Sequence, residues 1–279
     1  MKFFLYSLQL IRINNLCIAT LVVLLSAFLL PSYNHFDVII CILLVVLTMS
    51  FGYIMNDIND LEGDRINHPQ RILVNKKVNI FKARLLAIVF LGLAIILTSY
   101  IHLQGKIIYY FCVLPMLVLY NTHFKKKPII GNVIVSFLLA STFLFTEFII
   151  MGSLKHLLVP AFLAFHLSFI REIFKDLHDY KGDLHTSMNT LPIMLGITKT
   201  CYFLSVYIIL CCVGFLMPFI FKIYSHMYLI SLIFFIEIPL IYSLLLLLKS
   251  QTIKTFRKMV ILYKGLTICG LIVILSTKL

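Results

Sequence analysis

The chain has 279 residues, of which 61% are hydrophobic, and its mean hydropathy is +1.03. A soluble domain of this length cannot bury so much apolar surface, since such domains are usually about half apolar. The formal net charge of +13 would suit a nucleic-acid partner, but the cations are distributed as membrane topology requires, so no nucleic-acid partner is expected.

The predicted elements are helices throughout. Residues 1–15 predict an interfacial helix rather than a cleaved signal peptide, because no small-residue cleavage site follows the first apolar stretch. Nine later stretches approach the roughly 20 residues that a helix needs to cross a bilayer. They are residues 16–33, 36–56, 83–103, 106–120, 129–151, 157–174, 200–221, 227–248 and 259–276. Pro115 and Pro239 interrupt the fourth and the eighth, where kinks are expected. The sequence thus predicts an all-α, polytopic membrane bundle of nine transmembrane helices, forming a single domain over residues 1–279.

The basic residues predict the orientation of this bundle. If the N-terminus is cytoplasmic, 19 of the 24 Lys and Arg residues fall in connections on the cytoplasmic side. This asymmetry is the positive-inside pattern of membrane proteins. We therefore expect an integral protein of the inner (plasma) membrane, surrounded by membrane lipids, with the N-terminus and the acidic loops in the cytoplasm.

The acidic residues are few and concentrated. Eight of the 11 Asp and Glu residues lie in two connections on the predicted cytoplasmic side, and both clusters carry Asp at i, i+3 and i+7 with Gly before the last. These aspartates are Asp57, Asp60 and Asp64 in the first cluster and Asp176, Asp179 and Asp183 in the second. On a helix such positions share one face, where three anions repel one another unless cations neutralise them. Carboxylate oxygens without Cys or His favour Mg²⁺.

The position of the two clusters along the chain adds to this interpretation. The first ends the second predicted span and the second ends the sixth, so four spans separate them and both emerge on the same side. Two acidic faces confronting each other across a bundle could hold two or more Mg²⁺ ions and a diphosphate. The simpler alternative, a pair of solvated acidic loops, does not account for two copies with identical spacing.

These motifs resemble the UbiA superfamily of intramembrane prenyltransferases. The first family signature matches the run from Asn56 to Arg71, and the second matches the three aspartates from Asp176 to Asp183. Between them, Tyr120, the adjacent lysines and Gly131-Asn132 resemble the tyrosine–lysine loop of the family. The resemblance covers nearly the whole chain.

The resemblance implies a mechanism and a set of site residues. Both aspartate triads, as the catalytic and metal-binding residues, would hold Mg²⁺ with a polyprenyl diphosphate as substrate. Departure of diphosphate needs neutralisation of its growing negative charge, by metal ions and by preplaced cations and hydrogen-bond donors. The candidate diphosphate-binding residues are Asn56, Arg65, Arg71, Tyr120, Lys125, Lys126, Arg171 and Lys175.

The second loop is similar to one branch of the superfamily. The run from Arg171 to Asp183, followed by Thr190-Leu191-Pro192-Ile193, resembles the branch containing digeranylgeranylglyceryl phosphate synthase. That resemblance implies transfer of a geranylgeranyl group to geranylgeranylglyceryl phosphate, a lipid acceptor, in ether-lipid synthesis. The chain departs from the family pattern at Ile72, at His178 and in a turn over residues 74–77 that lacks glycine.

Two other functions remain open from the sequence. An aromatic acceptor, such as a quinone precursor, would keep the enzyme class and change only the second substrate. A divalent-cation transporter would use the carboxylates as ligands, but transport sites usually lie near mid-membrane on broken helices, whereas these acids lie at the ends of spans. Glu147 and Glu237, inside predicted spans, fit either a functional or a structural role. The sequence does not indicate an oligomeric state.

Overall fold

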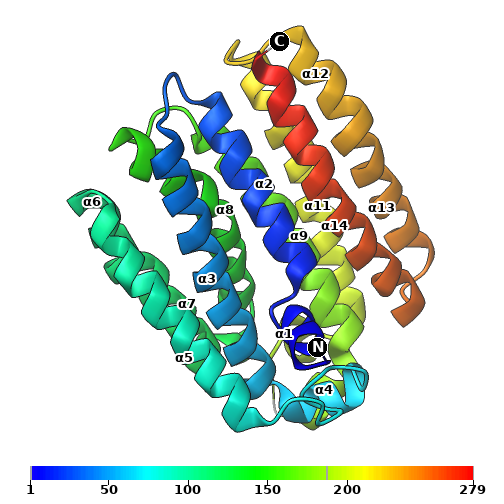
Figure 1. Ribbon diagram of the computed structural model, residues 1–279. Helices are drawn as coiled ribbons and strands as arrows, with labels where there is room; N and C mark the ends of the chain where they lie inside the picture. The colour runs from blue at the N-terminus through cyan, green and yellow to red at the C-terminus, as the bar shows by residue number, and fades with distance from the viewer. Residues whose placement is uncertain (1, 187, 279) are drawn as a thin grey trace. The chain divides into compact units, whose positions relative to one another are not determined.

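The computed structural model describes residues 2–186 and 188–278, with side chains from residue 5 onward, and all regular structure in this part is helical (Figure 1). The all-α prediction is therefore confirmed. In chain order the helices are α1 (Lys2–Leu10), α2 (Ile13–Leu29), α3 (His35–Asn59), α4 (Leu61–Asn67), α5 (Ile80–Leu97), η1 (Thr98–Tyr100), α6 (Leu103–Ile108), η2 (Tyr109–Val113), α7 (Leu114–Thr122), η3 (Phe124–Lys126), α8 (Ile130–Met151), α9 (Leu158–His185), α10 (Leu191–Leu195), α11 (Ile197–Ile220), α12 (His226–Leu232), η4 (Ile233–Glu237), α13 (Ile238–Lys249), α14 (Ile253–Leu275) and η5 (Ser276–Lys278).

Seven helical stretches in the described residues are long and apolar enough to cross a membrane. They are His35–Asn59, Ile80–Tyr100, Leu103–Thr122, Ile130–Met151, Ile197–Ile220, His226–Lys249 and Ile253–Lys278. Two further predicted spans form helices that do not meet this description: α2 has only 17 residues, and α9 carries Arg171, Glu172 and Lys175. The chain is an integral membrane protein, and the count of nine spans stays a prediction.

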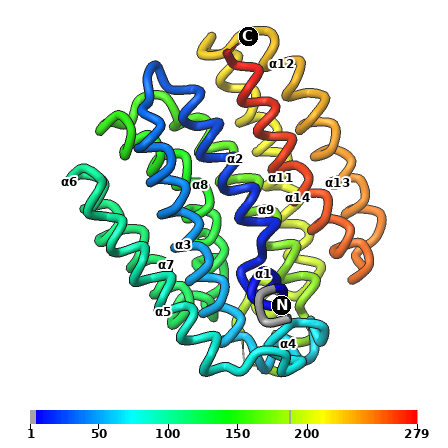
Figure 2. Tube along the Cα trace, viewed as in Figure 1, coloured from blue at the N-terminus to red at the C-terminus, as the bar shows by residue number. Residues whose placement is uncertain are grey.

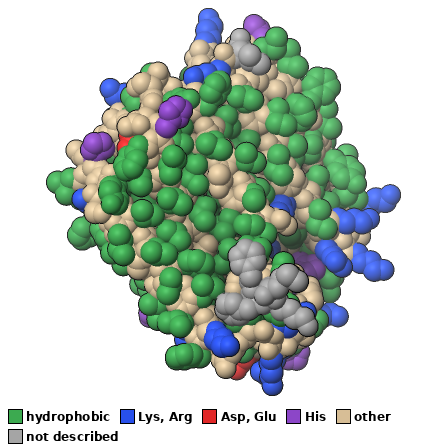
Figure 3. Space-filling model, viewed as in Figure 1, with side chains coloured by type: hydrophobic (Ala, Val, Ile, Leu, Met, Phe, Trp, Pro, Cys, Tyr) green, Lys and Arg blue, Asp and Glu red, His purple; other side chains and the backbone are tan. Residues whose placement is uncertain are grey.

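Large apolar side chains cover much of the surface, which is what a lipid environment requires. Phe111 and Tyr202 expose 78% and 74% of their area, and hydrophobic side chains occupy most of the face seen in Figure 3. Lys and Arg gather at its margins in that view. A protein in water would not expose apolar surface on this scale, because contiguous patches of more than a few hundred Å² are rare on soluble monomers.

The described residues divide into two compact units. One comprises residues up to 124 together with 142–157, and the other comprises 125–141 together with the residues from 158 onward. In the first unit α3 is central, since it packs against α2, α5 and α7. In the second, α9 packs against α10, α11 and α14, and Figure 2 shows α9 and α14 running alongside each other. The prediction of a single domain over the whole chain stays a prediction.

The two interrupted stretches contain local changes of helix type rather than sharp breaks. The π-helical turns η2 and η4 end two residues before Pro115 and Pro239 respectively. A proline has no N–H and its ring clashes with the carbonyl four residues earlier, so a widened turn accommodates it within the helix. The sequence located both interruptions, and the structure shows that each is a π turn.

Glu147 has a structural partner at the connection between α8 and α9. Its side chain is fully buried, and its carboxylate accepts backbone N–H groups from Lys155, His156 and Leu157 at 2.7, 2.8 and 2.9 Å. The ring Nδ1 of His156 lies 3.0 Å from the same carboxylate. Buried N–H groups need acceptors, so Glu147 holds the connecting loop against the end of α8. This observation favours the structural role that the sequence left open.

We predict that Glu147→Leu lowers the free energy of unfolding by about 3–5 kcal/mol, because three N–H groups lose a charged acceptor together. Glu147→Gln, which retains one carbonyl oxygen, should lose less, and His156→Ala, which removes a single contact, should lose least. Thermal unfolding of the detergent-purified variants measures this order. Equal stabilities for Glu147→Leu and His156→Ala would contradict the assigned role.

Candidate functional site

The first aspartate motif lies at the joint between α3 and α4. Asp57 belongs to α3, Asp60 stands between the two helices with φ −89° and ψ 2°, and Asp64 belongs to α4. Backbone bonds from Asp60 N to Asn56 O (2.9 Å) and from Asp64 N to Asp60 O (2.8 Å) preserve the four-residue spacing across the joint. The helical spacing therefore continues through all three aspartates, although a joint divides the helix that was expected to carry them.

One guanidinium links two of these carboxylates. Arg71 Nη1 lies 3.4 Å from Asp57 Oδ1 and also contacts Asp64 Oδ2, so Asp57 and Asp64 are on the same side of the joint. Asn56 Nδ2 donates to Asp60 Oδ2 at 2.9 Å. Burial raises the pKa of Asp64, whereas the charge of Arg71 opposes that shift. Two predicted diphosphate-binding residues, Asn56 and Arg71, thus contact the predicted metal ligands directly.

Arg12 is a site residue that the sequence analysis did not identify. It caps α2 with a left-handed backbone, φ 56° and ψ 57°, and its guanidinium pairs with Asp57 Oδ1 and lies 5.0 Å from the ring centre of Tyr53. A non-glycine residue in this conformation is uncommon and its strain is often found at functional sites. The only sequence signal was a cation at the start of an apolar stretch, which also fits the positive-inside pattern.

The turn after the first motif contains the departure noted in the sequence. Lys76 adopts φ 53° where the family pattern has glycine nearby, and its N–H and that of Lys77 donate to Leu73 O and Ile72 O, both at 3.1 Å. Ile72 and Leu73 are buried, so their packing holds the turn despite the cost of a left-handed lysine. The turn therefore closes although it contains no glycine.

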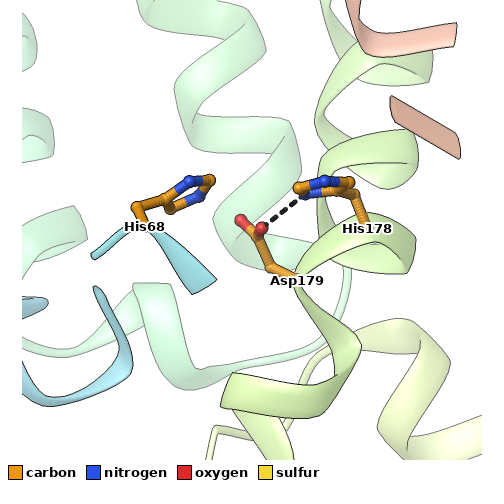
Figure 4. Close-up of side chains that lie close together, drawn as sticks. All are labelled: His68, His178 and Asp179. Carbon is orange, nitrogen blue, oxygen red and sulfur yellow. Dashed lines mark hydrogen bonds and ion pairs between the residues drawn. The ribbon is translucent and has the colours of Figure 1, made fainter. Parts of the chain in front are cut away.

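The second aspartate motif lies on the last turns of α9, without any joint. Asp176 Oδ2 accepts a hydrogen bond from Asn132 Nδ2 at 2.8 Å, and Asp183 Oδ2 accepts one from Thr190 Oγ1 at 3.2 Å. His178 Nδ1 lies 2.8 Å from Asp179 Oδ1. A dashed line marks this contact in Figure 4. The expectation that three carboxylates share a helix face fits this continuous helix.

Burial perturbs two of these carboxyls. It raises the pKa of Asp176 to about 7, opposed by the hydrogen bond from Asn132, and raises the pKa of Asp183 to about 6. The neighbouring charge of Asp179 raises the pKa of Asp183 further, while Lys175 and Lys125 oppose the shift. Each of these carboxyls therefore holds a proton to a higher pH than an exposed carboxyl does, unless a cation compensates its charge.

The other predicted diphosphate-binding residues have varied surroundings. Lys175 Nζ lies 2.9 Å from Glu172 Oε2, and Arg171 Nη1 lies 3.5 Å from Glu172 Oε1, so Glu172 holds both cations on α9. Tyr120 is half-buried near the end of α7, and Lys125 is half-buried in η3. Arg65 and Lys126 are exposed.

The donor chemistry fits Mg²⁺. Each triad offers carboxylate oxygens at helix ends. Guanidinium groups and an amide contact the first triad, and an amide, a hydroxyl and the His178 ring contact the second. Hard oxygen ligands of this kind suit Mg²⁺, which usually takes a few carboxylates and completes its shell with water and phosphate. The carboxylate oxygens of both triads are of the kind that Mg²⁺ takes as ligands.

Comparisons with known proteins agree with the helical membrane fold and indicate a family. The sequence profile described as the UbiA prenyltransferase family matches residues 16–265. Digeranylgeranylglyceryl phosphate synthase from Methanocaldococcus jannaschii is 33% identical over 258 residues, covering 90% of this chain and 88% of that protein. A solved structure described as digeranylgeranylglyceryl phosphate synthase in membranes has a TM-score of 0.74 and 29% identity, with full coverage of both chains. A UbiA homolog from Archaeoglobus fulgidus, bound to GPP and Mg²⁺, has a TM-score of 0.69 and 18% identity, covering 96% of this chain and 99% of the other.

We predict that Arg12→Gln lowers the free energy of unfolding by about 1–3 kcal/mol, because the buried Asp57 carboxylate loses one of its cations. Arg12→Gln combined with Asp57→Asn should cost less than the sum of the two single changes, since the uncompensated charge is gone. Denaturant unfolding of the four proteins completes this double-mutant cycle. Additive effects would contradict a direct interaction between Arg12 and Asp57.

The raised pKa of Asp176 predicts a pH dependence of stability in the presence of a chelator. An unfolded Asp titrates near pH 4, so between about pH 4 and pH 7 the folded protein binds more protons than the unfolded chain. The free energy of unfolding therefore decreases as pH rises through this range. Asp176→Asn cannot gain the charge, so its stability relative to wild type should increase with pH. Thermal unfolding from about pH 5 to pH 8 measures the difference, and a constant difference would contradict burial of this carboxyl.

Proposed function

This chain belongs to the UbiA prenyltransferase family, and on that premise we propose that it transfers a geranylgeranyl group from its diphosphate to geranylgeranylglyceryl phosphate. The chain is a membrane prenyltransferase. The observation that carries the finer proposal is the pair of aspartate triads, whose carboxylates are contacted by side chains such as Arg71 and Asn132. The chain that carries them is 33% identical to a digeranylgeranylglyceryl phosphate synthase over nearly its full length.

We propose that both triads bind Mg²⁺ together with one polyprenyl diphosphate. Mg²⁺, when bound, neutralises the charge that develops on diphosphate as the carbon–oxygen bond breaks. The residues of this chain would hold and orient that substrate. Asp57, Asp60 and Asp64 would provide one set of ligands, and Asp176, Asp179 and Asp183 the other.

The cations near the triads have two roles in this proposal. Arg71 would hold Asp57 and Asp64 in place and contact a phosphate oxygen with its remaining N–H groups, since a guanidinium carries five donors. Lys125, whose charge acts on Asp183, would approach the diphosphate from the loop before α8. Arg65, Tyr120, Lys126, Arg171 and Lys175 are further candidate contacts.

The hydrophobic surroundings fit a reaction through an allylic cation. Such a cation reacts with water, so the prenyl group needs a water-poor pocket, and aromatic rings stabilise its charge. We propose that the prenyl tail enters laterally from the bilayer and lies among apolar helices. The orientation in the plasma membrane, with both triads on the cytoplasmic side, rests on the distribution of basic residues.

The proposed acceptor rests on the relatives and on the second loop. A lipid acceptor bearing a phosphate fits the name of the Methanocaldococcus jannaschii relative and the resemblance of the run from Arg171 to Asp183. An aromatic acceptor is the second candidate within the same enzyme class. The family assignment gives no support to the cation-transporter hypothesis.

We predict that purified wild-type protein forms the diether product from geranylgeranyl diphosphate and geranylgeranylglyceryl phosphate in the presence of Mg²⁺. Asp60→Asn should reduce the rate by about 100-fold or more, because a ligand in the first triad loses its charge. Asp37→Asn is the matched control, since Asp37 lies in the first turn of α3, about 30 Å along the helix from Asp57. Product and released diphosphate are both measured, with a chelator sample alongside.

The outcomes of this assay separate the parts of the proposal. Magnesium-dependent release of diphosphate without a diether product would retain the prenyltransferase chemistry and overturn the lipid acceptor, and aromatic acceptors would be tested next. Equal rates for Asp60→Asn and Asp37→Asn would overturn the role of the first triad.

A further inference from the structure

Asn132 is a buried polar residue that directly contacts a predicted metal ligand. It lies in the first turn of α8, exposes 7% of its area, and donates a hydrogen bond from Nδ2 to Asp176 Oδ2 at 2.8 Å. The two residues are 44 positions apart in sequence and lie in the same compact unit. A hydrogen bond on one carboxylate oxygen limits rotation of the group and so fixes the direction of the other oxygen.

The backbone before Asn132 holds it in position. Ile129 has a φ of 64°, which is unusual for a β-branched residue. Around it, Ile130 N donates to Pro128 O at 2.7 Å and Val133 N donates to Ile129 O at 2.8 Å, so the turn leads directly into α8. One turn later Ser136 Oγ donates to Asn132 O at 2.6 Å. Asn132 is thus attached to a constrained helix start.

An amide differs from the cations that contact the first triad. Arg71 brings positive charge to Asp57 and Asp64 and occupies the same oxygens that a metal ion would bind. Asn132 donates a hydrogen bond without a net charge, so it orients Asp176 without neutralising the carboxylate. Buried carboxylates that ligate metals commonly have such a neutral partner, and its loss typically weakens metal binding about 10- to 100-fold.

We propose that Asn132 is a positioning residue of the second triad, which orients the Asp176 carboxylate for divalent-cation binding. This inference rests on the proposed function, in which Asp176 is a metal ligand. The strained turn at Ile129 fixes the start of α8 and thereby the place of the Asn132 amide. Neither Asn132 nor Ile129 would touch the reacting atoms.

The test measures metal binding directly in the presence of inorganic diphosphate. Mn²⁺ replaces Mg²⁺, and its EPR signal gives the concentration of free ion. Asn132→Ala and Asn132→Leu both remove the donor, and the leucine variant preserves the side-chain volume in case the alanine variant is unstable. Ser141→Ala is the matched control, because this buried hydroxyl of the same helix donates to the backbone oxygen of Leu138, beyond the turn that carries Asn132. Thermal unfolding establishes that each variant is folded.

We expect Mn²⁺ affinity to fall about 10- to 100-fold in both Asn132 variants and to stay unchanged in Ser141→Ala. In the transfer assay the Mg²⁺ concentration for half-maximal rate should rise by a similar factor, with most of the rate recovered at saturating Mg²⁺. A purely structural role would lower stability without this shift. Asn132→Ala should add little to Asp176→Asn, since the oriented ligand is already lost.

Two results would overturn the inference in distinguishable ways. If wild type binds Mn²⁺ and both Asn132 variants bind it equally well, Asn132 does not position a ligand, and the proposed function stands. If wild type itself binds no Mn²⁺ with diphosphate present, the metal-dependent function fails, and the role of Asn132 fails with it.

Discussion

Several carboxylates of this protein are buried or half-buried at the ends of apolar helices, and this constraint governs the arrangement around them. An ionised group in such surroundings is costly unless hydrogen bonds or opposite charges compensate it. Arg71 compensates Asp57 and Asp64, Asn132 donates to Asp176, and Thr190 donates to Asp183. Each partner comes from a neighbouring segment, so the loops and helix starts of each unit are arranged around the acids.

Much of the fold could be predicted because lipid makes simple demands on sequence. The apolar stretch predicted at 129–151 is α8, Ile130–Met151, and the stretch at 227–248 corresponds to the helical run His226–Lys249. A bilayer requires about 20 apolar residues whatever their packing partners, so hydropathy alone sets these limits within a few residues. α9 extends through the second motif to His185, beyond the predicted span 157–174. Hydropathy did not predict this extension, because the last turns of the helix are polar.

The partners of the aspartates could not be predicted from spacing. Spacing placed Asp57, Asp60 and Asp64 on one side, because their separation is a property of one helical segment. The pairing of Arg12 with Asp57 spans 45 residues and depends on how α2 packs against α3. The same holds for Asn132 and Asp176, which meet only because the start of α8 lies against α9. The position of Asp60 between two helices was also hidden, since the residue spacing is the same with or without a joint.

The joint at Asp60 divides the first triad between two helices of very different length. Asp57 is part of a 25-residue helix that packs against α2, α5 and α7, whereas Asp64 is part of a seven-residue helix that begins after the joint. A cation held by both would restrict the rocking of α4, and the entropy lost in that restriction would subtract from the binding free energy. If the first triad binds a cation as proposed, a stiffer short helix would lose less of this entropy and would bind the cation at a lower concentration.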